Sequence, residues 1–203
     1  MSEPMTVSAK EVAELRRQTG AGVMECKRAL EETGGDLAKA VEWLRARGGA
    51  KADRRADREV KQGLVECYLH HNGKVGVLIE VNCETDFVAR TDDFRVLCRD
   101  LAMHVASTAP IAVAAADVPA EIVERERRIY TEQVVQEGKP EAIRSKIVEG
   151  KLKKFFQESV LLEQPFVKDD KQTVGELVKA VSSKTGENVV VRRFVRFQIG
   201  EAV

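Results

Sequence analysis

The sequence predicts an α+β protein: a three-helix bundle, then a core whose three-stranded antiparallel sheet is covered by helices. Three short helical patterns fill the first fifty residues. Two alternating segments then flank Asn72-Gly73, a pair typical of tight hairpins. A third alternating segment, at residues 188–198, is expected to complete the sheet.

The opening fifty residues carry the start and stop signals of three helices. Ser8 and Glu11 have the spacing of a capping box, and Gly20-Ala21-Gly22 breaks the first helix. A second helix is expected over residues 23–32, and Asp36 caps a third. Three such helices make a minimal bundle, marginal by itself and typical of recognition modules.

Two features of this bundle have alternative interpretations. Gly20-Ala21-Gly22 has the beginning of a dinucleotide loop, but residue 25 is Glu and a helix precedes the segment. A helix–helix turn is therefore favoured. Trp43 lies beside the apolar stripe of the third helix, where it either packs inside the bundle or faces a partner.

Residues 51–62 are expected to form a charged helical linker, because apolar residues become rare there. Four cations share one helical face: Lys51, Arg54, Arg55 and Arg58. The favoured interpretation is a solvated connecting helix. The alternative is a basic stripe that contacts an acidic protein surface or RNA phosphates.

Residues 63–203 are expected to form the α+β core and its dimerisation surface. Strands are predicted at 64–70 and 75–82, and the second alternates strongly. His70 and His71 at the turn do not predict a metal site, because neighbouring strand residues point to opposite faces. In the last strand, Val195 and Phe197 are assigned to the same apolar face as Val189 and Val191. An exposed face or edge on so small a sheet favours self-association.

Helical patterns separated by Pro and Gly follow the hairpin. One helix is predicted over residues 92–107, with His104 as either a core-edge residue or a contact residue. The later elements are a helix ending near residue 137, two short helices at 143–148 and 152–158 split by Gly150, a loop at 163–170, and a helix from Thr173 to Thr185.

Composition excludes several classes of protein. The 33 basic and 33 acidic side chains give a net charge of zero, which argues against a protein that mainly wraps nucleic acid or lies on a membrane. No apolar run could span a bilayer, and the first residues have no signal-peptide pattern, so a cytoplasmic protein is expected. The four cysteines are widely spaced, which predicts reduced thiols without a metal site.

No pattern of catalytic residues stands out, so neither an enzyme nor a bound cofactor is expected. The sequence has no phosphate-binding loop, nucleophile elbow or paired-carboxylate pattern. Cys67 or Cys83 could form a thiol triad with His70 and Asp86, but no local signature supports this alternative.

The best candidate for a functional segment is Val81-Asn82-Cys83-Glu84-Thr85-Asp86-Phe87-Val88-Ala89-Arg90. It begins as a buried strand and ends where a long amphipathic helix is about to start. Between them a short joint carries an aspartate beside a phenylalanine. The end of a strand is a place from which side chains can be presented to a partner.

Several motifs follow one another along the chain: Thr19-Gly20-Ala21-Gly22, Cys26-Lys27-Arg28-Ala29-Leu30, Glu80-Val81-Asn82-Cys83-Glu84-Thr85-Asp86-Phe87-Val88-Ala89-Arg90, Ala102-Met103-His104-Val105-Ala106, Gln164-Pro165-Phe166-Val167 and Gly186-Glu187-Asn188. Together and in this order they resemble one family, elongation factor Ts, the nucleotide exchange factor for the GTPase elongation factor Tu. It covers almost the whole chain.

The resemblance implies a fold and a mechanism. Residues 1–50 would be similar to a ubiquitin-associated (UBA) fold and would bind the GTPase, with Gly20, Ala21, Gly22 and His104 as candidate contacts. The segment Thr85-Asp86-Phe87-Val88 would dislodge the GTPase's Mg²⁺. Phe87 would wedge beside the nucleotide site, and Asp86 would displace elements that hold the metal. The alternatives are core packing at a helix entry for Phe87 and an N-cap for Asp86.

The resemblance also implies an assembly. Longer members of the family contain two copies of the core unit and an inserted coiled coil, whereas this chain has room for one copy and is expected to lack the insertion. A non-covalent homodimer is therefore expected, with one GTPase per subunit in a 2:2 complex and no direct role for nucleic acid or membrane. The alternative function is an RNA- or ribosome-binding module that uses the stripe from Lys51 to Arg58.

Overall fold

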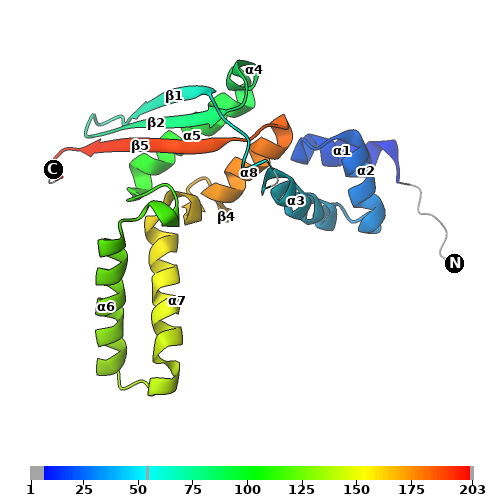
Figure 1. Ribbon diagram of the computed structural model, residues 1–203. Helices are drawn as coiled ribbons and strands as arrows, with labels where there is room; N and C mark the ends of the chain where they lie inside the picture. The colour runs from blue at the N-terminus through cyan, green and yellow to red at the C-terminus, as the bar shows by residue number, and fades with distance from the viewer. Residues whose placement is uncertain (1–6, 54, 202–203) are drawn as a thin grey trace. The chain divides into compact units, whose positions relative to one another are not determined.

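The computed structural model describes residues 7–53 and 55–201, without the side chains of residues 49–53. It confirms a protein of mixed helices and strands with a three-stranded antiparallel sheet (Figure 1). The chain divides into two compact units. The first contains residues up to 63 together with 83–94 and 178–190, and the second contains residues 64–82, 95–177 and 191–203. No helix within the described ranges has the length and apolar character needed to cross a bilayer.

Three helices form the bundle of the first unit: α1 (Ala9–Thr19), α2 (Val23–Glu32) and α3 (Leu37–Asp53). The capping box predicted for Ser8 and Glu11 is present, because each residue's side chain accepts a bond from the other's backbone N–H. The buried centre consists of Val12, Leu15, Cys26, Ala29, Leu30 and Ala40. Trp43 packs against this centre, as one of its two interpretations predicts.

The helix predicted across residues 51–62 is wrong beyond Asp53, where α3 ends. Residues 55–57 form a turn. The side-chain amide of Asn188 donates to the backbone carbonyls of Ala56 at 3.2 Å and Arg58 at 3.0 Å. These tertiary bonds satisfy carbonyls that a helix would otherwise use, and the sequence pattern carries no sign of them.

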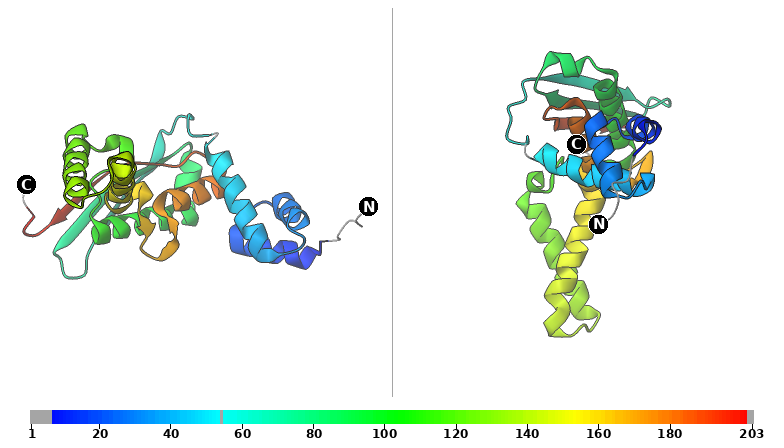
Figure 2. Two further views of the ribbon diagram at one scale, coloured as in Figure 1. Left: turned by 90° about the horizontal axis from the view of Figure 1, so that it is seen from below. Right: turned by 90° about the vertical axis from the view of Figure 1, so that its right-hand side faces the viewer.

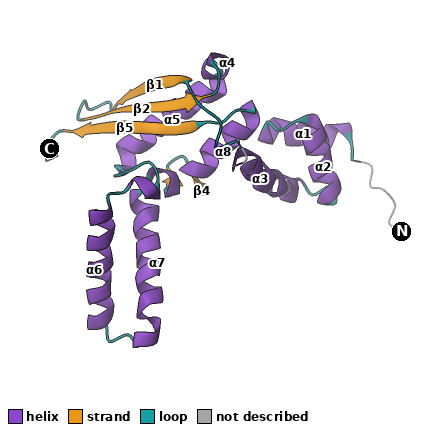
Figure 3. Ribbon diagram, in the orientation of Figure 1, coloured by secondary structure: helices purple, strands orange, loops and turns teal. Residues whose placement is uncertain are grey.

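The three-stranded sheet has the order β1 (Gln62–Leu69), β2 (Val75–Cys83), β5 (Val190–Gln198). The predicted hairpin turn is confirmed, and Gly73 adopts a left-handed φ of 66°. In β2, Val77, Ile79 and Val81 are buried. Helix α5 (Asp92–Thr108) runs along one face of the sheet (Figures 1 and 3), and Arg196 of β5 donates to its Ala106 carbonyl.

The single apolar face predicted for the last strand is wrong. Val191 is buried, whereas Val195 is 40% exposed and Phe197 is 69% exposed. The alternation changes parity at Arg192 and Arg193, which are both exposed. The outward side chains of the sheet therefore include Val65, Leu69, Leu78, Val195 and Phe197, with Ile199 just beyond β5.

Helices α6 (Ala120–Gln136) and α7 (Glu141–Ser159) form an antiparallel hairpin that Figure 2 shows from two sides. Two short helices split by Gly150 were predicted at 143–148 and 152–158. This prediction is wrong, because α7 is continuous through Gly150. Gly150 in a helix costs only about 1 kcal/mol relative to Ala, which packing around Val134, Val148 and Leu152 offsets.

The loop predicted for residues 163–170 is also wrong. Short strands β3 (Pro165–Phe166) and β4 (Asp169–Thr173) pair antiparallel, after a 3-10 turn over Leu161–Glu163. Another 3-10 turn covers Ala115–Asp117. Helix α8 (Val174–Thr185) follows β4, and Gly186 after it has a left-handed φ of 80°.

Candidate functional site

A one-turn helix, α4 (Asp86–Ala89), follows β2 at the joint singled out from the sequence. Its N-cap is Thr85, whose hydroxyl accepts the N–H of Val88 at 3.4 Å. The N-cap alternative for Asp86 is therefore wrong. Asp86 occupies the first turn, and its carboxylate accepts a hydrogen bond from the Arg90 guanidinium at 2.7 Å.

Phe87 points away from the core. It is 78% exposed, whereas the next two residues, Val88 and Ala89, are each 5% exposed. Core packing of Phe87 at a helix entry is therefore wrong. The buried pair fixes one side of α4 to the protein, and the other side carries Asp86, Phe87 and Arg90 at the surface. An exposed aromatic ring on a short helix that is anchored by two buried residues suits insertion into a partner.

Glu187 holds the start of α4. Its Oε2 accepts the backbone N–H groups of Glu84 at 3.1 Å and Thr85 at 3.0 Å. Its Oε1 accepts the hydroxyl of Thr85 at 2.6 Å. A single carboxylate thus binds three donors at the point where β2 becomes α4.

The neighbouring carboxylate, Glu84, extends this network. Its Oε1 accepts the backbone N–H of Asn188 at 2.6 Å and a guanidinium N–H of Arg58 at 3.3 Å. Asn188 in turn binds the carbonyls of residues 56 and 58. Three segments distant in sequence meet here: residues 56–58, residues 84–85 and residues 187–188.

Cys83 lies beneath the joint and is fully buried. Its thiol donates to the Thr85 carbonyl at 3.1 Å. Burial, assisted by the negative charge of Glu187, raises the pKa of Cys83 to about 11. A thiol with that pKa is a poor nucleophile at neutral pH.

The other members of the suggested thiol triad have different partners. The Nδ1 of His70 lies 3.0 Å from the hydroxyl of Tyr68, and Asp86 pairs with Arg90. Cys67 is exposed. No contact joins the predicted nucleophile, base and acid among the described residues.

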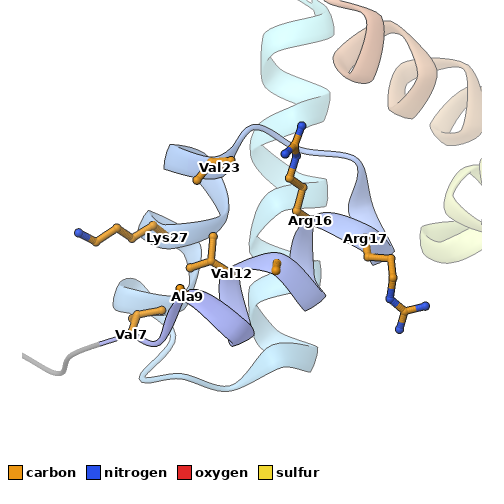
Figure 4. A pocket seen from close by; sticks show the side chains of 8 residues that line it. Val7, Ala9, Val12, Arg16, Arg17, Val23 and Lys27 are labelled. Atoms are coloured by element: carbon orange, nitrogen blue, oxygen red, sulfur yellow. The ribbon is translucent and has the colours of Figure 1, made fainter.

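A groove of about 660 Å³ lies between α1 and α2 (Figure 4). Its lining is apolar at Val7, Ala9, Val12, Ala13 and Val23, with the cations Arg16, Arg17 and Lys27 beside it. Met24, which follows Val23, is 73% exposed. This surface was not predicted from the sequence. The pair Val23-Met24 could have indicated it, because these two apolar residues at the start of α2 lie outside its buried face.

The segment Gly20-Ala21-Gly22 is the turn between α1 and α2, as predicted. Gly20 ends α1 with a left-handed φ of 67°. A Cβ at Gly20 would lie 2.8 Å from the side chain of Lys184, whose ammonium pairs with Asp93 at 2.7 Å. The glycine therefore serves both a turn and a close approach.

His104 is completely buried in the second unit. Its Nδ1 accepts the N–H of Val167 at 3.2 Å, so the proton lies on Nε2, which is 2.9 Å from Oε1 of Gln164. Burial lowers the pKa of His104, and the bond with Gln164 only partly opposes this effect. The ring is positioned to join α5 to residues 164–167.

Two cations of the predicted basic stripe lie within the described residues, and each has a partner inside the protein. Arg55 donates to the Ser182 carbonyl and Arg58 pairs with Glu84, while Arg54 and the side chain of Lys51 lie outside the described residues. Within the described ranges, no group of three or more His, Cys, Asp or Glu side chains could hold a metal ion.

Comparisons with known proteins identify the family of this chain. The family model described as Elongation factor TS matches residues 8–201. Elongation factor Ts of Coprothermobacter proteolyticus is 55% identical over 197 residues, which cover 97% of this chain and 100% of the relative. Those of Fervidobacterium nodosum and Heliobacterium modesticaldum are each 53% identical over 97% of this chain, covering 100% and 92% of the relatives. The chain therefore belongs to the elongation factor Ts family.

Proposed function

We propose that this protein is the guanine nucleotide exchange factor for elongation factor Tu and accelerates GDP release by displacing the bound Mg²⁺. The observation that carries the proposal is the exposure of Phe87 directly before the buried residues Val88 and Ala89 of the same helix. A soluble domain has no internal use for an aromatic ring presented this way, but a protein that inserts the ring into a partner does.

Mg²⁺ is the target that makes this mechanism effective. It links nucleotide phosphates to protein groups, so its loss weakens nucleotide binding without any contact to the base. Phe87 enters between helices beside the nucleotide site, and Asp86 displaces the groups that hold the metal. The factor binds the empty GTPase more tightly than the loaded one, and by linkage nucleotide weakens the factor's binding by the same ratio.

The size of Phe87 is adequate for this role. Burying its ring in a partner would contribute roughly 2–3 kcal/mol, which corresponds to about 30- to 150-fold in an equilibrium constant. No bond is made or broken by the factor, so this function requires neither an enzyme active site nor a cofactor. We place the reaction in the cytoplasm, where translation elongation occurs.

We propose that residues 1–50 are a UBA-like module that grips the GTPase through the groove between α1 and α2. Its apolar lining and cationic residues suit a partner helix with an apolar side chain flanked by carboxylates. Gly20-Ala21-Gly22 borders this groove through Val23. Residues 51–62 connect the module to a core formed by residues 63–203. His104 could reach a partner only if residues 164–167 moved away from it.

The direct experiment follows release of fluorescent GDP from elongation factor Tu by stopped flow. The protein should accelerate release by about 100-fold or more, as a coupling of about 3 kcal/mol allows. The double variant Asp86→Ala/Phe87→Ala should lose most of this acceleration while its fold is retained. Ile143→Ala, which removes an exposed apolar side chain on α7, is the control and should act as wild type. Salt-sensitive binding to RNA without acceleration would favour the alternative module.

We also propose a homodimer, giving a 2:2 complex with the GTPase, that closes through the outward face of the sheet. Its exposed apolar side chains come from all three strands and form a surface that a second copy would cover. Cys67 lies on β1 between two of them, Val65 and Leu69.

Dimerisation should therefore slow alkylation of Cys67 as protein concentration rises, in parallel with sedimentation as a dimer. Phe197→Asp should abolish both effects. Sedimentation as a monomer at micromolar concentration, with exchange activity intact, would contradict the dimer.

A further inference from the structure

The joint between β2 and α4 is held from outside its own segment. The three donors that Glu187 accepts all belong to residues 84 and 85, more than a hundred positions earlier in the chain. The helix that carries Phe87 has only one turn. Such a helix is not stable by itself, so its direction depends on the contacts at its start.

The position of Glu187 at the start of α4 is fixed by the residues around it. Helix α8 ends at Thr185, and the left-handed Gly186 turns the chain so that Glu187 follows at once. The hydroxyl of Ser182 donates to the Glu187 carbonyl at 2.5 Å, and the amide of Asn188 binds the carbonyls of residues 56 and 58. The backbone on both sides of Glu187 is thereby fixed.

A carboxylate is the group that fits the three donors. Both of its oxygens accept, whereas an amide at this position would present a donor to one of them. Thr85 connects the carboxylate to the helix, because its hydroxyl donates to Glu187 and accepts the N–H of Val88. Loss of Glu187 would leave that hydroxyl free to rotate and would weaken the N-cap of α4.

We propose that Glu187 is a positioning residue for nucleotide exchange: through Thr85 it sets the direction in which α4 presents Phe87. This inference rests on the exchange function proposed above. Glu187 does not touch the GTPase in this account. Its effect is on how productively a bound factor acts, and not on how tightly it binds.

Two kinetic quantities separate these effects. In Glu187→Ala, the maximum rate of GDP release at saturating factor should fall about tenfold or more, since small errors in position have large kinetic effects. The factor concentration that gives half-maximal rate should change less than about twofold, because the groove of the bundle is unaltered. Glu187→Gln, which retains one acceptor, should fall between wild type and alanine.

A matched control exists at the other end of α8. Glu176 accepts the N–H of Thr173 at 2.9 Å, and the Thr173 hydroxyl accepts the N–H of Glu176. Glu176→Ala therefore also removes a glutamate that caps a helix beside a threonine. It should leave the maximum rate at the wild-type value.

A double-variant cycle distinguishes positioning from general destabilisation. If Glu187 acts through Phe87, the combined variant Glu187→Ala/Phe87→Ala should be no slower than Phe87→Ala alone. Fully multiplicative losses would overturn the inference, as would a wild-type maximum rate in Glu187→Ala. If Glu187→Ala does not fold, Thr85→Val provides the same cycle, because it removes only the connecting hydroxyl.

The outcomes also separate this inference from the function on which it rests. If wild-type protein fails to accelerate GDP release, the exchange function itself is overturned. A different outcome would overturn only the positioning role: wild type accelerates release, Phe87→Ala does not, and Glu187→Ala still does.

Discussion

Phe87 and His104 reverse the usual preferences of their side chains. Phe87 is an apolar ring that is 78% exposed, and His104 is a polar ring with no exposed surface. The sequence left both residues ambiguous between a structural role and a partner contact. The structure buries the ring of His104 and exposes that of Phe87.

The difference lies in the partners that each ring has inside the protein. Both ring nitrogens of His104 lie within hydrogen-bond distance of a partner in the second unit, so burial of the ring leaves no polar atom unsatisfied. Phe87 is on the same short helix as two buried residues, but its side chain points away from the side on which they are buried. An exposed aromatic ring contributes little to stability, so the effect of Phe87 should be seen in the proposed exchange reaction.

The largest expected effect is therefore on stability at His104. His104→Ala should lower the free energy of unfolding by about 3 kcal/mol, because it opens a cavity, leaves the N–H of Val167 without its acceptor and removes one of the bonds to Gln164. For a chain of this length the melting temperature should fall by about 6–12 °C. Calorimetry measures both values.

Phe87→Ala is the matched variant for this prediction. It should change the free energy of unfolding by less than about 0.5 kcal/mol, because the ring is exposed. A loss of stability at Phe87 equal to that at His104 would contradict the contrast between the two residues.

The buried histidine should also make stability depend on pH. Because burial lowers the pKa of His104 below the ordinary histidine value of about 6.5, the unfolded chain binds a proton that the folded chain does not. The stability that comes from neutral His104 is complete above pH 6.5 and is lost as the pH falls below it, with a slope of at most about 1.4 kcal/mol per pH unit. Urea unfolding at pH 7.5 and 5.5 tests this, and His104→Asn should remove that part of the dependence.

Glycines extend the contrast between open and packed positions. A Cβ at Gly150 in α7 would meet no atom within 4 Å, whereas one at Gly175 would lie 2.9 Å from the Leu162 carbonyl oxygen. Gly150→Ala should stabilise the helical hairpin by up to about 1 kcal/mol. Gly175→Ala should destabilise the protein. Thermal unfolding of the two variants would refute this account if their shifts had the same sign.

The smallest effect is expected at the ion pair beside Phe87. Asp86 and Arg90 are both largely exposed, and such pairs contribute about 0.5 kcal/mol or less. Arg90→Ala should thus leave the melting temperature almost unchanged. A clear loss of stability would show that Asp86 is held as a structural residue.

The features that could be predicted from the sequence are those that depend on a few neighbouring residues. The hairpin at Asn72-Gly73 needs a left-handed glycine, and the capping box of α1 needs only Ser8 and Glu11, so both were visible in the sequence. The errors arose where distant contacts decided the outcome. Gly150 was assigned to a break because helix propensity is local, whereas packing between α6 and α7 keeps the helix continuous.

The sequence indicated the segment of the candidate site, but it did not indicate the residue that holds this segment, Glu187. Thr85-Asp86-Phe87-Val88 stood out as a joint after a buried strand, although the direction of Phe87 was undecided. Glu187 could not be connected to Thr85, because 102 residues separate the bonded pair. The groove beside Val23 was missed because it forms only when α1 and α2 pack together.

The most direct test of the central claim measures GDP release from elongation factor Tu by saturating wild-type protein and by Phe87→Ala, with Mg²⁺ present and after chelation. Wild type should accelerate release by about 100-fold with Mg²⁺ present, and Phe87→Ala should lose most of that acceleration. After chelation the two proteins should give similar rates, because the metal is already gone. Equal acceleration by both proteins in the presence of Mg²⁺ would contradict the account.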